Sequence, residues 1–291
     1  MDLILVAEQA LNGLQFGLML FLLAAGLTLV FGIMDLINLA HGSLYMVGAY
    51  LAAAAMAAGA SFLVAVIAAV AGTALFGMLL EVTLLRRLYQ RDHLSQVLAT
   101  FALILMLNTP AALSGPVELL PGLMYPAYRL LIIGVGLAVA VALYLLVTRT
   151  RWGMWVRAGA SNRAMTTAMG VPADRLFTAV FGIGAALCAL AGSLLGPLLA
   201  VQVGMGESIL ILAFVVIVIG GIGSIRGALV GALLVGLVDT GSRTLLPAAL
   251  RQIASPEVAS TLGPSIAAIL IYVLMAAVLF WKPRGLFPAR G

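Results

Sequence analysis

The chain has 291 residues, of which 64% are hydrophobic and 9% charged, and its formal net charge is +5. Soluble proteins carry about 25% charged residues and 45–50% apolar ones, so this composition excludes a soluble domain and indicates a polytopic membrane protein. The fifteen basic residues are dispersed between hydrophobic stretches and form no continuous basic face, which argues against nucleic acid as a partner.

Nine apolar stretches are candidates for membrane-spanning helices, since a bilayer core about 30 Å thick requires about 20 apolar residues per helix. The predicted fold is therefore an all-α polytopic membrane protein with about nine transmembrane helices, in a single transmembrane domain over residues 1–291. The glycine-rich segment GGIGSIRG (220–227) interrupts a long apolar run, which we divide into two helices. The expected helices cover residues 9–32, 42–58, 61–85, 94–113, 129–148, 177–200, 208–222, 227–246 and 263–281.

A polar break, MDLINLAHGS (34–43), follows the first of these stretches. Asp35, Asn38 and His41 recur at every third residue, so on a helix they would share one face. Polar groups at membrane depth are costly and usually face a cavity or a partner. Two interpretations stay open: with Ser43 the segment lines a translocation route as a discontinuous helix, or Asp35 and Asn38 cap the next helix in a polar turn. A metal site is not expected, because there is one local histidine and no cysteine.

A second glycine-containing break, VQVGMGES (201–208), follows the sixth stretch. If the first four stretches pair with the last four, the fifth is a bridge and the two halves start on opposite sides of the membrane. Such inverted repeats are common among transporters. The sequence therefore favours an internal inverted repeat.

The longest polar interruption lies at residues 149–176. It contains five of the fifteen basic residues and two of the three tryptophans, Trp152 and Trp155. A simple connection would be much shorter, so we expect a short amphipathic helix on the cytoplasmic face that contacts another protein. The tryptophans suit the membrane interface and are expected to anchor the start of the loop.

The basic residues also predict the orientation, because cytoplasmic loops collect Lys and Arg. Twelve of the fifteen fall on one side if the segments 86–93, 149–176, 223–227 and the C-terminal tail are cytoplasmic. With nine spans, the N-terminus is then periplasmic and the C-terminus cytoplasmic.

Gly223, Gly227 and Gly231 recur at every fourth residue, a spacing that lets helix backbones approach closely. This pattern predicts helix packing, either within one bundle or, less favoured, at a dimer seam. These glycines therefore predict how helices pack and give no indication of a chemical reaction.

No phosphate-binding loop, H-E-x-x-H or G-x-S-x-G motif occurs, so we expect no catalytic residues and no cofactor bound by this chain. If ATP drives the protein, another subunit binds it. A secondary transporter is a second hypothesis, with ion-coupling candidates Asp35, Glu81, Glu207 and Asp239, although the long 149–176 loop would then lack a purpose. A membrane-embedded enzyme is a third, and it lacks paired catalytic groups.

Two stretches resemble one family. GLTLVFGIMDLINLAHGSLYMVGAYLA (26–52) is similar to the N-terminal signature of the branched-chain amino-acid permeases of bacterial ABC importers, the H-type member of the leucine/isoleucine/valine system. RAGASNRAMTTAMGVPADRLFTAVFGIGAALCALAGSLLG (157–196) resembles the same family's cytoplasmic loop and following helix, and VIVIGGIGSIRGALVGALLVG (216–236) also fits.

The resemblance implies a type II ABC importer permease in the bacterial inner membrane, with 149–176 as the coupling loop that docks on the ATPase. It implies two ATP-binding subunits that hold ATP and magnesium, a second permease that is a different but related chain, a periplasmic solute-binding protein and membrane lipid as partners. The substrate would be a branched-chain amino acid, urea, a short amide or another organic acid. Small residues and donor side chains would form the ATPase contact, with Gly170 and Pro172 ending the helix; the implied contact residues are Arg157, Ala158, Asn162, Arg163, Ala164, Ala168, Gly170 and Val171.

Overall fold

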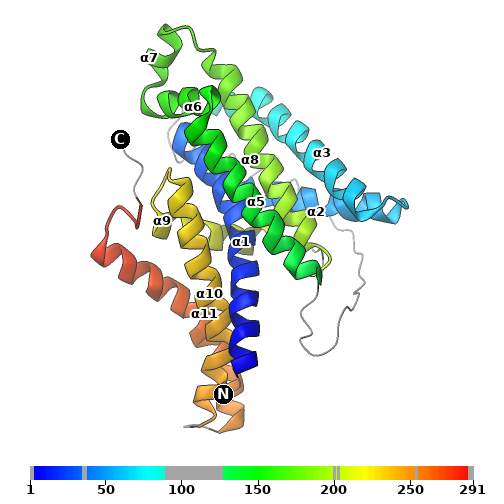
Figure 1. Cartoon of the computed structure of the whole chain (residues 1–291), viewed down its shortest axis with the longest axis vertical. Helices are drawn as coiled ribbons and strands as arrows, with labels where there is room; N and C mark the ends of the chain where they lie inside the picture. The colour runs from blue at the N-terminus through cyan, green and yellow to red at the C-terminus, as the bar shows by residue number, and fades with distance from the viewer. Residues whose placement is uncertain are drawn as a thin grey trace.

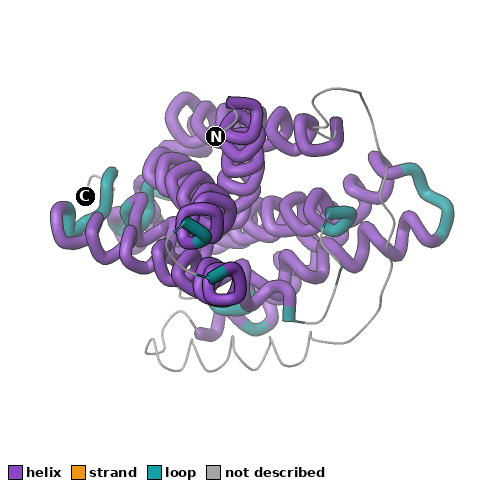
Figure 2. The backbone as a smooth tube through the Cα atoms, turned by 90° about the horizontal axis from the view of Figure 1, so that it is seen from below, coloured by secondary structure: helices purple, strands orange, loops and turns teal. Residues whose placement is uncertain are grey.

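The computed structural model describes residues 3–34, 38–88, 127–198, 201, 204–252 and 255–287. These residues form helices and connecting loops, with no strand among them (Figures 1 and 2). The expected span 94–113 lies outside the described residues. The helices are α1 (Leu3–Met34), α2 (His41–Ala57), α3 (Phe62–Thr83), the 3₁₀ helix η1 (Leu85–Leu88), α5 (Ala127–Arg149), α6 (Arg151–Ser161), α7 (Arg163–Ala168), α8 (Ala173–Leu195), α9 (Met205–Gly220), α10 (Ile225–Leu250) and α11 (Pro256–Trp281).

Each of the other eight expected spans contains a helix, so the fold is that of an all-helical, multi-pass membrane protein. Six helices are long and apolar enough to cross a membrane, namely α1, α3, α5, α8, α10 and α11. Helices α2 and α9 are shorter, with 17 and 16 residues. A crossing of about 20 residues is the norm, so the expectation of nine full spans stays a prediction for these two and for 94–113.

Helices α1 and α8 form the centre of the bundle. Most residues of their apolar spans are buried, whereas in α3, α5, α10 and α11 only a minority are. Helices α2 and α3 pack on α8, and α9 and α10 pack on α1. In Figure 1, α2 and α3 accordingly lie on one side of the central helices, and α9, α10 and α11 on the other. Each half of the chain therefore surrounds the first helix of the other half.

The two sequence breaks meet inside this bundle. Gly42 lies in the first turn of α2 and Gly206 in the first turn of α9. A Cβ atom added to Gly42 would lie 2.3 Å from the carbonyl oxygen of Gly206, and one added to Gly206 would lie 2.1 Å from that of Gly42. The starts of α2 and α9 are thus in backbone contact, at the only residue type that allows such an approach.

The division of 208–246 into two helices is confirmed at Gly221–Ser224. Gly221 has φ +104°, a conformation that side chains rarely adopt. The amides of Leu286 and Phe287 donate to the carbonyls of Ile219 and Gly220, both at 2.8 Å. The chain after α11 therefore satisfies two of the carbonyl groups that the end of α9 leaves unpaired.

The basic segments that the structure describes lie at one end of the bundle, which we name the basic end and define by α6 and α7 (Figure 1). Arg86 contacts the start of α8, and Arg157 donates to a carbonyl in the last turn of α5. Arg226, at the start of α10, contacts Tyr144 near the end of α5. The segments that sequence analysis placed on one side of the membrane thus lie at the same end in space.

Candidate functional site

The 149–176 loop contains two short helices rather than the single helix expected, which is a correction. Helix α6 starts after Thr150, whose hydroxyl accepts a hydrogen bond from the amide of Gly153 at 3.0 Å. Asn162 has extended backbone angles, so it ends α6. Its side-chain oxygen then accepts from the amide of Met165 at 2.9 Å and caps α7. A short polar side chain of this kind is a preferred N-cap.

Gly170 and Pro172 end the second helix in the expected way. Gly170 has φ +86° and follows the last residues of α7. Its amide donates to the carbonyl of Thr167 at 2.9 Å, and the amide of Val171 donates to that of Thr166 at 3.3 Å. A glycine in this conformation after a helix is a common C-terminal cap. The chain then turns directly into α8.

The three polar side chains assigned to an interface make contacts within the chain, two as donors and Asn162 as an acceptor. Arg157 donates to the Val147 carbonyl, and Asn162 caps α7. Arg163 pairs with Asp174 in the first turn of α8 at 2.9 Å, and its guanidinium lies 4.5 Å from the ring centre of Phe177. Both partners of this ion pair are exposed, so its energy is small. The structure assigns these side chains the task of holding α6 and α7 in place.

Among its exposed residues, the loop presents several small apolar side chains. Ala158, Ala164 and Ala168 are exposed, as expected for a surface that another protein approaches closely. Sequence analysis missed two methionines, Met165 and Met169, which are 61% and 79% exposed. They are four residues apart, a spacing that could have marked them as neighbours on one face, and methionine is common at protein-binding surfaces.

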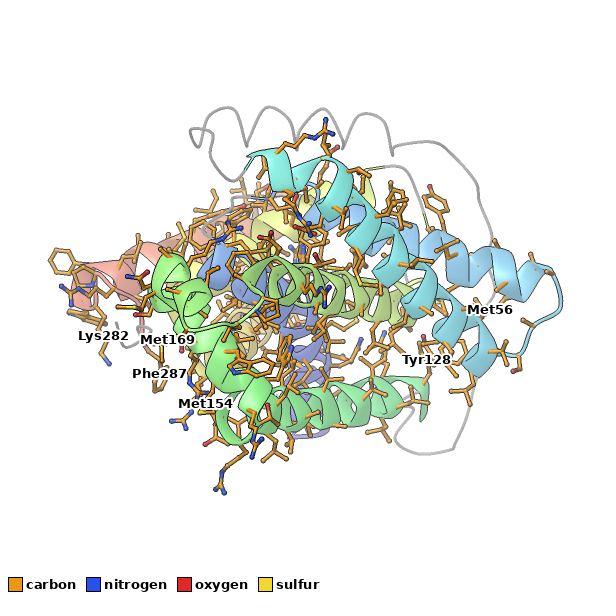
Figure 3. The ribbon with its side chains drawn as sticks, turned by 90° about the horizontal axis from the view of Figure 1, so that it is seen from above. Met56, Tyr128, Met154, Met169, Lys282 and Phe287 are labelled. Carbon is orange, nitrogen blue, oxygen red and sulfur yellow. The ribbon has the colours of Figure 1, made fainter. Side chains whose placement is uncertain are left out.

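The wider surface of the basic end includes the segment after α11. In Figure 3, which looks at the molecule from above, the labelled Met154, Met169, Lys282 and Phe287 lie on the same side. Met154 is 53% exposed, so an apolar side chain of α6 also faces outward. Exposed apolar side chains and basic ones therefore occur together at this end of the molecule.

A buried ion pair lies beside this surface. Glu81 in the last turn of α3 is fully buried, and both of its oxygens accept from Arg86, at 3.3 and 3.1 Å. The hydroxyl of Thr178 in α8 donates to Glu81 at 2.7 Å and accepts from Arg86 at 2.7 Å. We call these three residues the α3–α8 clamp. Thr178 lies one turn after Asp174, so the clamp joins α3 to the helix that holds Arg163.

The polar break at 34–43 is not a helical face. Helix α1 ends at Met34 and α2 begins at His41, and Asn38 is non-helical, so the expectation that Asp35, Asn38 and His41 share one face of a helix is wrong. Asp35 lies outside the described residues. The side chain of Asn38 accepts from the Ala40 amide at 3.1 Å, which is the geometry of a local polar turn before α2.

His41 and Ser43 are buried together with Asn38. The His41 ring lies where α1 and α8 cross, because a Cβ atom on Gly26 would be 2.9 Å from its Nε2 and one on Gly184 would be 3.4 Å from its Cε1. Neither ring nitrogen makes a hydrogen bond of ordinary geometry within the part of the chain that the structure describes. A role for Asn38, His41 and Ser43 in a solute route stays a prediction.

The glycine stripe divides between two tasks. Cβ atoms on Gly227 and Gly231 of α10 would lie 2.1 Å from the Gly220 carbonyl and 2.6 Å from the Val216 carbonyl of α9. These two glycines therefore pack α10 on α9 within one chain. Gly223 is in the turn between the helices with φ +80°, where its Cα faces Gly32 of α1.

The chain is similar to known proteins of one family. The family described as "Branched-chain amino acid transport system / permease component" matches residues 9–279. The chain is 30% identical to the high-affinity branched-chain amino acid transport system permease protein BraD of Pseudomonas aeruginosa, over 96% of this chain and 94% of BraD.

It is also 30% identical to the corresponding permease protein LivH of Escherichia coli, over 85% of this chain and 89% of LivH. The chain is also similar to the fructose import permease protein FrcC of Rhizobium meliloti over a shorter stretch. The two are 34% identical over 35% of this chain and 31% of FrcC. No solved structure matches.

Proposed function

Because this chain belongs to the family of permease components of branched-chain amino acid transport systems, we propose that it is the membrane-spanning subunit of an ATP-binding-cassette importer. Its solute is a branched-chain amino acid or a similar small polar molecule, moved inward by ATP hydrolysis in partner chains. The observation that supports this most directly is the α6–α7 surface, which a stand-alone transporter would not need. The names BraD and LivH support the choice of solute.

The assembly we propose contains two ATP-binding subunits, a second related permease and a periplasmic solute-binding protein. The chain lies in the bacterial inner membrane with its basic end toward the cytoplasm, where α6 and α7 contact one ATP-binding subunit. The exposed Ala158, Ala164, Ala168, Met165 and Met169 form that contact, and the side chains bonded within the loop keep it rigid.

An inverted repeat is part of the same proposal. The first and second breaks meet at Gly42 and Gly206, and each half packs its second and third helices on the first helix of the other half. An internal duplication with α5 as the bridge accounts for both observations. It would place the two short helices α2 and α9 in equivalent positions.

A secondary transporter is less compatible with the geometry. Such a protein needs an intramembrane carboxylate that exchanges an ion. Glu81 is bound by Arg86 and Thr178, and Asp239 pairs with Arg243 at 2.8 Å. In both cases an arginine donates to the carboxylate oxygens that a coupling ion would have to bind.

Reconstitution tests the proposal. The chain, purified with the ATP-binding subunits, the partner permease and the binding protein of its own operon, is placed in liposomes and supplied with radiolabelled leucine. We expect uptake that requires ATP and is unaffected by uncouplers of proton and sodium gradients. Uptake that collapses with the gradient and persists without ATP would reject the importer.

The Ala164→Glu variant is expected to reduce ATP-driven uptake at least tenfold. Ala164 is exposed on α7, so the carboxylate is harmless in the isolated chain but becomes desolvated when a partner covers the helix. An unpaired charge in an interface costs several kcal/mol, and about 1.4 kcal/mol is a factor of ten. The readouts are leucine uptake and the amount of ATP-binding subunit that copurifies.

Ala249→Glu is the matched control for this variant. Ala249 is an exposed alanine in the last turn of α10, at the opposite end of the bundle. We expect it to retain uptake and the bound ATP-binding subunits. Equal behaviour of the two variants would remove α7 from the interface.

Thiol labelling is expected to place the basic end in the cytoplasm. In a chain with Cys188 replaced by alanine, Ala160→Cys on α6 should react with a membrane-impermeant maleimide in inside-out vesicles and remain unmodified in intact cells. Ala249→Cys should show the reverse. The opposite pattern for the pair would invert the proposed topology.

A further inference from the structure

A hollow lies between α5 and α10, over the surface of α1. Helices α5 and α10 both pack on α1 but make few contacts with each other. The hollow has a volume of about 210 Å³, and its floor is the fully buried Phe21 of α1. We call it the α5–α10 groove; its lining residues are Phe21, Leu137, Ala140, Val141, Tyr144, Ile225, Arg226 and Leu229.

The groove is apolar along most of its length and open on the outer side of the bundle. Leu137 and Val141 line it and are 46% and 57% exposed. Helix α5 is one of the apolar spans in which only a minority of residues are buried. Side chains of this kind on a membrane-spanning helix face acyl chains, so the mouth of the groove opens toward lipid.

One end of the groove is positively charged. Arg226 lies in the first turn of α10, and its guanidinium donates to the hydroxyl of Tyr144 at 2.7 Å and lies 4.9 Å from the centre of the Tyr144 ring. Both side chains are exposed. The N-terminus of α10, a helix of 26 residues, adds the positive end of its dipole at the same place. Tyrosine and arginine at the end of an apolar span mark the level of lipid headgroups.

We propose that the α5–α10 groove is a binding site for an anionic phospholipid such as phosphatidylglycerol. One acyl chain lies between α5 and α10 against Phe21, and the phosphodiester is held by Arg226 at the start of α10. The shape supports an acyl chain, because the groove is apolar with its only charged group at one end. The charge supports an anionic headgroup, because arginine forms strong paired hydrogen bonds with phosphate oxygens. A polar solute would find its only polar partners, Arg226 and the Tyr144 hydroxyl, at one end of an apolar groove. An apolar partner helix would bury the Arg226 charge without a counter-charge.

Lipid retention tests the site. The full chain with its partner subunits is purified in a mild detergent from membranes that contain phosphatidylglycerol and phosphatidylethanolamine, and the retained lipids are counted by native mass spectrometry. We expect Arg226→Gln to lower retained phosphatidylglycerol at least threefold with little change in phosphatidylethanolamine. Val141→Trp, which covers the mouth at an exposed position, should produce the same loss with Arg226 intact.

Arg251→Gln is the matched control. Arg251 is exposed at the other end of α10, so its loss should leave retained phosphatidylglycerol unchanged. Equal loss of both lipids in Arg226→Gln, equal loss in Arg251→Gln, or wild-type retention in Val141→Trp would each overturn the site. So would efficient cross-linking of Val141→Cys to a partner subunit in place of labelling by a photoreactive acyl chain. None of these measurements depends on transport, so they stand apart from the importer proposal.

Discussion

Arg86→Met is expected to lower the stability of the folded chain more than any other single change in the α3–α8 clamp. The substitution keeps the length of the side chain and removes the charge that faces Glu81. Glu81 is fully buried, so its carboxylate would lose its counter-ion and retain only the hydroxyl of Thr178 among the clamp residues. Removing one partner of a buried ion pair costs about 3–5 kcal/mol.

Glu81→Gln is expected to cost less, about 1–2 kcal/mol. The amide oxygen can still accept from Arg86 or Thr178, and Arg86 is 34% exposed, so water partly solvates the charge that remains. The double variant Glu81→Leu with Arg86→Met should recover much of the loss, because a buried pair replaced by apolar side chains leaves no charge behind. We therefore expect the wild type to be the most stable and Arg86→Met the least stable. Glu81→Gln and the double variant should lie between them, close to each other.

The chain supplies its own reporter for this series. Cys188 is the only cysteine and is buried in α8, so a fluorogenic maleimide reacts with it when the helices separate. Heating each variant in detergent with this dye gives a midpoint of unfolding. A midpoint for Arg86→Met equal to that of Glu81→Gln would show that the carboxylate finds another partner. A double variant less stable than Arg86→Met would contradict the ion-pair account.

The helices were predictable because their cause is local. A bilayer demands a run of apolar residues that satisfies its own backbone, and eight of the nine expected runs contain a helix in the described residues. The short lengths of α2 and α9 are also close to those expected, 42–58 and 208–222. What could not be predicted is that their first turns meet. Each starts inside the bundle, where the protein and not the bilayer sets the first turn.

The polar segments were harder because one pattern fits two structures. A polar residue at every third position suits a helical face, but Asn38 accepts from the Ala40 amide and holds a turn. Asn162 is a second example. We expected it to donate to a partner protein, but in the structure it ends α6 and caps α7. Short amide side chains compete with the helix for backbone partners, and the outcome depends on packing that lies beyond the segment.

Contacts between residues far apart in the sequence could not be predicted from the sequence. Thr178 and Glu81 are separated by 97 residues in sequence, and no local pattern links a threonine near the start of one helix to a glutamate near the end of another. The two glycine-containing breaks were recognised as similar, yet similarity alone did not predict that Gly42 and Gly206 touch. The exposed Met165 and Met169 were missed for a different reason: their spacing marks them as neighbours on one face but does not say whether that face is exposed.

Gly206→Ala and Gly42→Ala are each expected to destabilise the fold by about 1–3 kcal/mol or more, the usual cost of overpacking. A Cβ atom at either position would lie 2.1–2.3 Å from the carbonyl oxygen of the other glycine. The obstacle is backbone on both sides, so no side-chain rotation relieves it, and the starts of α2 and α9 must separate. Because these two helices join the halves of the chain, we expect lower yields of folded protein and an earlier Cys188 reaction on heating.

Gly134→Ala and Gly241→Ala are the matched controls for this contact. Both glycines lie inside helices, α5 and α10, and a Cβ atom at either meets nothing within 4 Å. Alanine lowers the backbone entropy of the unfolded chain, so these variants should be neutral or more stable by up to about 1 kcal/mol. The same substitution is therefore expected to have opposite signs at the two kinds of site. If Gly206→Ala matches Gly241→Ala in its midpoint, α2 and α9 do not meet at their glycines, and the proposed duplication loses its central contact.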